Sequence, residues 1–73
     1  MTNIATIYVS LLNEGVDVRR PVLAEQLGAG IYRIADQEYD REIETWEFPP
    51  GAEVVCQLVA SSGGEVLAAI SRR

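Results

Sequence analysis

Acidic side chains recur at every second position in one short stretch of this 73-residue chain. The five that keep this spacing are Asp36, Glu38, Asp40, Glu42 and Glu44. In an extended backbone alternate side chains point to the same side, so these carboxylates are expected to project from one face. Because like charges on one face repel each other, such a face must be solvated or bound to something positive. The pattern therefore predicts binding, either of a basic protein surface or of a divalent metal ion.

The simplest alternative for this stretch is a solvated loop that keeps a sheet edge from pairing and the protein in solution. An EF-hand calcium loop is a further comparison, because acidic residues occupy positions 1, 3, 5, 9 and 12 counted from Asp36. Position 6, which needs glycine for its sharp turn, holds Arg41. The sequence FPPG at 48–51 also prevents the second helix. We therefore do not predict an EF-hand.

The same stretch carries the whole charge imbalance of the chain. Eleven acidic residues and six arginines give a net charge of −5, and residues 36–47 hold six of the acids with Arg41 as their sole cation. An acidic protein repels phosphate backbones, so we expect no nucleic-acid partner. The partner that suits this charge is a protein with a basic surface. Two alternatives stay open: binding of a divalent metal ion by carboxylates, and mimicry of nucleic acid to inhibit a basic protein.

Catalytic groups are scarce in this chain. It has no histidine and no lysine, which removes the commonest general base and the Schiff-base nucleophile. A catalytic thiolate needs such a neighbour, so the single cysteine, Cys56, is interpreted as a small core residue. We predict a protein that is not an enzyme and has no cofactor.

The expected location is the cytoplasm. A lone cysteine fits a reducing compartment, and the N-terminal residues lack the basic start of a signal peptide. No run approaches the ~18 apolar residues of a membrane span, so we expect no membrane partner.

Two further segments resemble nucleic-acid-binding or phosphate-binding motifs but lack features that these motifs need. Residues 23–30, LAEQLGAG, resemble the second helix and turn of a helix-turn-helix motif. However, the segment at 4–12 before them is β-branched, and the segment at 31–38 after them is acidic where DNA contacts need basic residues. Gly28-Ala29-Gly30 is not a phosphate-binding loop, because the third glycine and the lysine are missing.

Short apolar segments separated by glycine-containing turns predict the elements that carry these groups. The expected strands are residues 4–12, 22–27, 31–35, 53–60 and 65–70. Residues 22–27 also permit one or two helical turns, with Pro21 at the start and Gly28 after the end. A hairpin with 31–35 is the preferred interpretation. An open sheet this small would leave long exposed edges, so we predict one all-β domain, a five-stranded antiparallel SH3-like barrel.

The aromatic residues Trp46 and Phe48 end the acidic stretch and share a face if the backbone there is extended. We interpret them as part of the core or as a plug for the barrel end, because aromatic side chains bury the most area. An exposed shelf with Tyr32 or Tyr39 that docks peptides is the alternative. The sequence leaves open whether Trp46 is buried. Arg19 and Arg20 are expected to pair with the acidic stretch or to lie in solvent.

Five blocks of sequence together form a recognisable pattern. They are VDVxRPV at 16–22, LGxGxYRI at 27–34, WEFPPG at 46–51, VC at 55–56 and GEVL at 64–67. The pattern resembles a group of small uncharacterised bacterial proteins that are expected to be all-β. The resemblance implies a compact β domain and a bacterial origin, and it carries over no activity and no functional residue.

The predicted function is that of an interaction module with an acidic and aromatic surface. The candidate partner-binding residues are Asp36, Glu38, Tyr39, Asp40, Glu42, Glu44, Trp46 and Glu47. Neutralising Asp40, Glu42 and Glu44 together is expected to abolish binding without lowering stability. A homodimer formed through an uncovered strand edge is compatible with this function and would help a small core.

Overall fold

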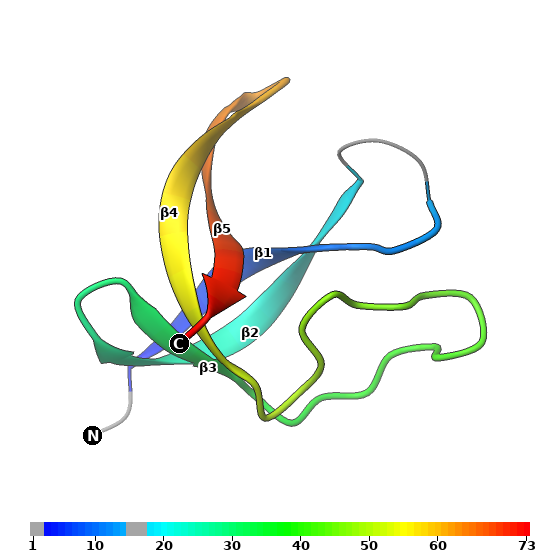
Figure 1. The fold of residues 1–73 in the computed structure, drawn as a ribbon, viewed down its shortest axis with the longest axis horizontal. Coiled ribbons are helices and arrows are strands. Elements are labelled where there is room, and N and C mark those ends of the chain that lie inside the picture. Colours follow the sequence, from blue (N-terminus) through cyan, green and yellow to red (C-terminus); the bar gives the residue numbers. More distant parts are fainter. Residues whose placement is uncertain (1–2, 15–17) are drawn as a thin grey trace.

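Five strands form the fold in the computed structural model, which describes residues 3–14 and 18–73 (Figure 1). The strands are β1 (Ile4–Ser10), β2 (Arg19–Gly28), β3 (Ile31–Ile34), β4 (Glu53–Ser61) and β5 (Gly64–Arg72). Each strand pairs with the next in an antiparallel manner, and β1 meets β5 to close the barrel. The prediction of an all-β, five-stranded, SH3-like barrel is confirmed.

The closing pair corrects one part of that prediction. β1 and β5 are parallel and meet at one residue pair, Tyr8 with Ala68. The reason is the odd number of strands, since strands that alternate in direction leave the first and the fifth pointing the same way. The sheet is therefore mixed rather than purely antiparallel, and its seam between β1 and β5 is narrow.

Two tight hairpins build the rest of the sheet. β2 and β3 are joined through Ala29 and Gly30, and Gly30 has a φ of 72°, which glycine adopts at no steric cost. This hairpin settles the ambiguity at 22–27, which is strand and not helix. β4 and β5 are joined through Ser62 and Gly63 in the same way.

Several strand boundaries differ from the predicted ones, among them the end of β1 and the start of β2. The first strand was expected to reach residue 12 but ends at Ser10. The N–H of Leu11 still donates to the carbonyl of Val18 (2.9 Å), whereas the N–H of Leu12 donates to Thr45 in the β3–β4 loop. The second strand begins at Arg19, before Pro21. Proline is tolerated there because Pro21 pairs with Tyr8 on one side, while on the other side no strand of the described part of the chain pairs with it. Residues 16 and 17, which begin the VDVxRPV block, lie outside the described residues.

The core lies inside the barrel and is built by alternate residues of β1 to β4, by Ala69 of β5 and by three residues of the β3–β4 loop. Its members, each less than a tenth exposed, are Ile7, Val9, Val22, Ala24, Tyr32, Ile34, Trp46, Phe48, Ala52, Val54, Cys56 and Ala69. Trp46 and Phe48 come from the loop and not from a strand, so the prediction that they pack in the core is confirmed. No helix that could cross a membrane occurs in the part of the chain that the structure describes.

Candidate functional site

The acidic stretch forms most of the long loop between β3 and β4, which runs along the lower right of Figure 1. We call residues 36–47 the acidic loop. It is not an extended strand, since the backbone N–H of Glu44 donates to the carbonyl of Asp40 (2.9 Å) and folds the chain back on itself. The carboxylate of Asp40 also accepts from the N–H of Glu42 (3.0 Å). The expectation that five carboxylates share one strand face is therefore not met.

Gln37 fastens the first part of the acidic loop to β2. Its side-chain oxygen accepts from the N–H of Leu23 (3.0 Å), and its side-chain nitrogen donates to the carbonyl of Leu23 (2.9 Å). The same nitrogen donates to the carbonyl of Ala35 (2.8 Å). These bonds take the place of a neighbouring strand at this point of β2.

The backbone that follows β1 fastens the last part of the loop. The N–H of Leu12 donates to the carbonyl of Thr45 (2.7 Å), and the N–H of Glu47 donates to the carbonyl of Ser10 (2.9 Å). Leu11 and Trp46 form the bridge between these two bonds. Both parts of the acidic loop are thus held to the barrel by hydrogen bonds.

An aromatic stack holds the middle of the loop. Tyr39 lies on the buried ring of Trp46 with 4.0 Å between centroids and 20° between planes, and the guanidinium of Arg41 lies 5.1 Å from the Tyr39 centroid. Glu44 supports the stack, because its Oε1 accepts from Nε1 of Trp46 (3.0 Å). Its Oε2 lies 3.2 Å from the guanidinium of Arg20. The expected pairing of Arg20 with the acidic stretch is present.

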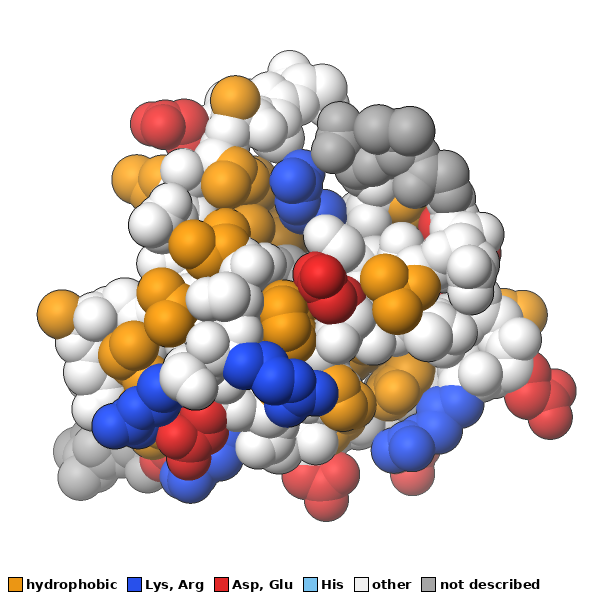
Figure 2. Space-filling view, in the orientation of Figure 1, with side chains coloured by type: hydrophobic (Ala, Val, Ile, Leu, Met, Phe, Trp, Pro, Cys, Tyr) orange, Lys and Arg blue, Asp and Glu red, His pale blue; other side chains and the backbone are white. Residues whose placement is uncertain are grey.

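These contacts divide the eight candidate residues into two groups. Tyr39, Glu44 and Trp46 are buried or half-buried and shape the loop. The remaining candidates are exposed carboxylates, namely Asp36, Glu38, Asp40, Glu42 and Glu47. Figure 2 shows acidic side chains projecting from the rim of the molecule on the side where the loop runs. Because Glu44 is used internally, it does not belong in a variant meant to leave stability unchanged.

The distribution of ion pairs separates the loop from the rest of the surface. Among the described residues, the five exposed carboxylates form no ion pair. Outside the loop, Arg33 pairs with Glu25 and with Glu53 (3.8 Å), and Arg73 pairs with Glu53 (3.1 Å), while the exposed Glu14 and Glu65 form no ion pair with a described residue. The hydrogen bond and charge of Glu25 also raise the pKa of Arg33. Uncompensated negative charge therefore gathers on the acidic loop.

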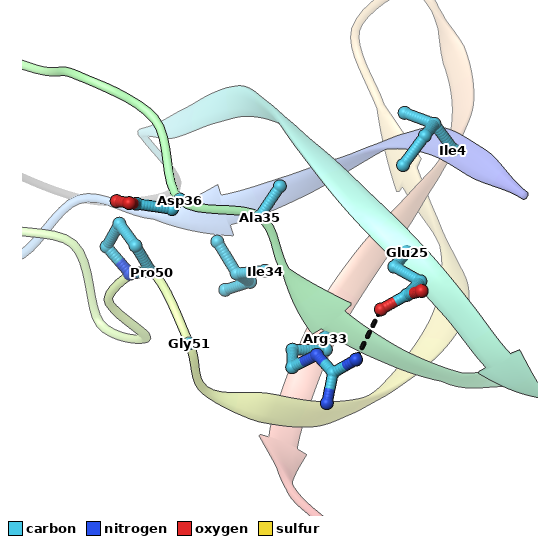
Figure 3. Close-up of a pocket in the computed structure, with 8 residues that line it drawn as sticks. All are labelled: Ile4, Glu25, Arg33, Ile34, Ala35, Asp36, Pro50 and Gly51. Atoms are coloured by element: carbon cyan, nitrogen blue, oxygen red, sulfur yellow. Dashed lines mark hydrogen bonds and ion pairs between the residues drawn. The ribbon is translucent and has the colours of Figure 1, made fainter. Parts of the chain in front are cut away.

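A shallow hollow of ≈ 460 Å³ lies where the loop leaves β3 (Figure 3). Ile4, Ala35 and Pro50 give it apolar walls, and Asp36 borders it beside Pro50. The Glu25–Arg33 ion pair lies on its other side. An apolar wall beside a carboxylate suits the aliphatic stem and charged head of a lysine or arginine. Sequence reasoning missed this hollow, because Ile4 and Pro50 are far apart in the chain and neither has a polar group.

Cys56 and the grouping of acidic side chains are the remaining features with a bearing on chemistry. Cys56 is buried, and burial raises the pKa of its thiol to about 11, so at neutral pH it is a protonated core residue. No group of three or more cysteine or acidic residues within 3–14 and 18–73 is arranged to hold a metal ion.

Comparisons with known proteins add no assignment. No family model matches the chain, and neither a curated protein nor a solved structure matches it.

Proposed function

We propose that this protein is a non-catalytic interaction module whose acidic loop binds a basic surface on another protein. One observation supports this most. Five carboxylates are exposed and in no ion pair with another described residue, on a backbone that is fastened to the barrel at several points. Elsewhere, Glu25 and Glu53 are each paired with an arginine.

Fixing the loop before binding favours affinity. A flexible acidic segment loses conformational entropy when it binds, whereas a loop already held by Gln37 and by the Tyr39–Trp46 stack loses less. Concentrated negative charge also speeds the encounter with a cationic partner and discourages acidic ones.

The hollow beside Asp36 provides an anchor for the partner. We infer that one lysine or arginine of the partner lies against Ile4, Ala35 and Pro50 with its charged end near Asp36. A single basic side chain that is partly desolvated in this way contributes more to affinity than charges at the rim. The unpaired, protonated Cys56 is compatible with a reducing compartment, and we propose that the interaction takes place in the cytoplasm.

The test compares two variants that lose the same charge in different places. Glu38→Gln/Glu42→Gln removes two exposed acids from the loop, and Glu14→Gln/Glu65→Gln removes two exposed acids outside it. The tagged chains are used to capture proteins and nucleic acids from a lysate of the source organism, and the affinity for the captured protein is then measured by calorimetry at low and moderate salt.

We expect the loop variant to bind about tenfold more weakly, a change of about 1.4 kcal/mol. The matched control is expected to change affinity less than about twofold, because its charges lie away from the contact. Equal affinities for the two variants, or capture of nucleic acid without protein, would overturn the proposal.

A further inference from the structure

β4 extends well beyond the strand that covers its outer edge. β3 pairs with residues 53–55 of β4, and the last contact on that side is the N–H of Cys56 donating to the carbonyl of Gly30 (2.8 Å). Past this point, on the side away from β5, no strand among the described residues accompanies Gln57–Ser61. We call residues 57–61 the β4 edge.

The backbone groups that face outward from the β4 edge follow from strand geometry. In an antiparallel sheet, successive residues direct their N–H and C=O groups to opposite sides. Because the N–H of Cys56 points away from β5, those of Leu58 and Ala60 point the same way. Each of these two residues therefore presents one donor and one acceptor at the edge.

The β4 edge lacks the features that normally prevent strand pairing. Proteins block free edges with proline, charged side chains or covering loops. β2 has such protection, since Pro21 has no N–H and Gln37 covers the backbone of Leu23. In contrast, residues 57–61, QLVAS, contain neither proline nor charge.

Three of the five side chains at this edge are apolar, and two of these, Leu58 and Ala60, are exposed. Leu58 is 63% exposed because it points to the inner side of the sheet at a level where the barrel no longer covers it. Figure 2 shows hydrophobic side chains gathered over the β4–β5 hairpin. Such a surface gains free energy when it is covered.

We propose that a second copy of this chain binds at the β4 edge, with the two β4 strands antiparallel about a two-fold axis at Val59. In this register Leu58 exchanges two backbone hydrogen bonds with Ala60 of the second copy, and symmetry repeats the exchange. A two-fold contact brings the same surface together from both subunits. Residues 57–61 carry no charge, so the two paired strands do not repel each other.

The position of the acidic loop favours this occupant. The loop lies on the opposite side of the barrel from the β4–β5 hairpin (Figure 1), so pairing through the hairpin keeps the two acidic loops at the outer ends of the dimer. An uncharged edge offers nothing specific to a basic partner. A second copy satisfies its hydrogen-bond pattern residue for residue.

Sedimentation of the full chain over a range of concentrations tests the proposal. We expect the average mass to rise from that of one chain to that of two. Leu58→Lys, which places a charge at the edge, and Ala60→Pro, which removes an outward N–H, are each expected to abolish this rise. Leu23→Lys is the matched control, because Leu23 is also exposed but lies on β2. A chain that stays monomeric at millimolar concentration, or a dimer that survives Leu58→Lys, would overturn the proposal.

Cysteine cross-linking tests the register directly. Residues at position 59 face each other across the axis as a non-hydrogen-bonded pair, with Cα atoms about 4.5 Å apart, which is within the span of a disulfide. Val59→Cys is therefore expected to form a covalent dimer under mild oxidation. Val66→Cys, which pairs with Val59 but lies one strand further in, is expected to stay uncross-linked. The buried Cys56 is present in both variants, so any cross-linking through Cys56 is the same in both. Equal cross-linking of the two variants would contradict this register.

Discussion

The acidic loop and the β4–β5 hairpin both extend beyond the barrel, but different interactions hold them in place. The loop contains no strand or helix and is fixed by side chains. These contacts are the hydrogen bonds between Gln37 and β2, the Tyr39–Trp46 stack and the hydrogen bond from Trp46 to Glu44. The outer hairpin is held by its backbone ladder, from Leu58 paired with Leu67 to the turn. Most of the acidic side chains lie on the acidic loop, and the outer part of the β4–β5 hairpin carries only Glu65.

This difference indicates that the two regions suit different partners. A loop with uncompensated carboxylates repels its own copies and attracts a basic protein. A neutral strand edge does not select partners by charge, but its free N–H and C=O groups can form hydrogen bonds with an identical edge. Substitution of the bonded or buried side chains of the loop should lower stability, whereas substitution of exposed side chains on the hairpin should leave it unchanged.

The largest expected effect is that of Trp46→Ala. It removes a buried aromatic ring, the surface on which Tyr39 stacks and the donor to Glu44, so the free energy of unfolding is expected to fall by about 3–5 kcal/mol. Leu58→Ala on the hairpin is expected to change it by less than about 0.5 kcal/mol, since Leu58 is exposed. Urea unfolding followed by circular dichroism measures both. If both variants lost a similar free energy of unfolding, the claim that the loop contributes to stability and the hairpin surface does not would be wrong.

A second comparison lies within the acidic loop. Glu44→Ala leaves Nε1 of Trp46 without its acceptor and Arg20 without its partner, so a loss of about 1–3 kcal/mol is expected. Glu42→Ala removes an exposed acid whose side chain makes no ion pair with a described residue, and a change within about 0.5 kcal/mol is expected. The same unfolding measurement distinguishes them. If Glu42→Ala were the more damaging variant, the assignment of Glu44 as the internal support would be wrong.

A smaller effect concerns pH. Burial raises the pKa of Cys56 from 9.0 to about 11, so the folded state keeps its thiol proton at pH values where the unfolded state loses it. The thiol therefore contributes its full stability below pH 9, and this contribution is lost as the pH rises towards 11. At pH 10 the expected loss is about 1 kcal/mol. Cys56→Ala, measured over the same pH series, should lack this part of the decline, and an identical decline in both chains would contradict it.

The regular parts of the fold could be predicted because local patterns determine them. Alternating apolar residues with glycine turns mark β3, β4 and β5, and the number of strands follows from their spacing. The parallel pairing of β1 and β5 also follows from the odd number of strands. It was not predicted because every pair of successive strands is antiparallel. The extension of β2 to Arg19 could not be predicted from propensity, because Pro21 is acceptable only where β2 lacks a second neighbour.

The structure of the acidic loop could not be predicted, because side-chain contacts between distant residues determine it. The alternation of acids from Asp36 to Glu44 predicts an extended face, but the bond from Glu44 to Asp40 turns the chain. Nothing in the sequence distinguishes Glu44 from Glu42, although one supports Trp46 and the other is exposed. The free β4 edge was equally hidden, since it depends on where β3 ends relative to β4.

The most direct test of two separate surfaces measures both activities on both variants. Glu38→Gln/Glu42→Gln and Leu58→Lys are each examined for affinity towards the captured partner by calorimetry and for self-association by sedimentation. We predict that the loop variant loses affinity and still dimerises, and that the edge variant stays monomeric and keeps its affinity. A loss of both activities in either variant would contradict the account, because it would mean that one surface serves both partners.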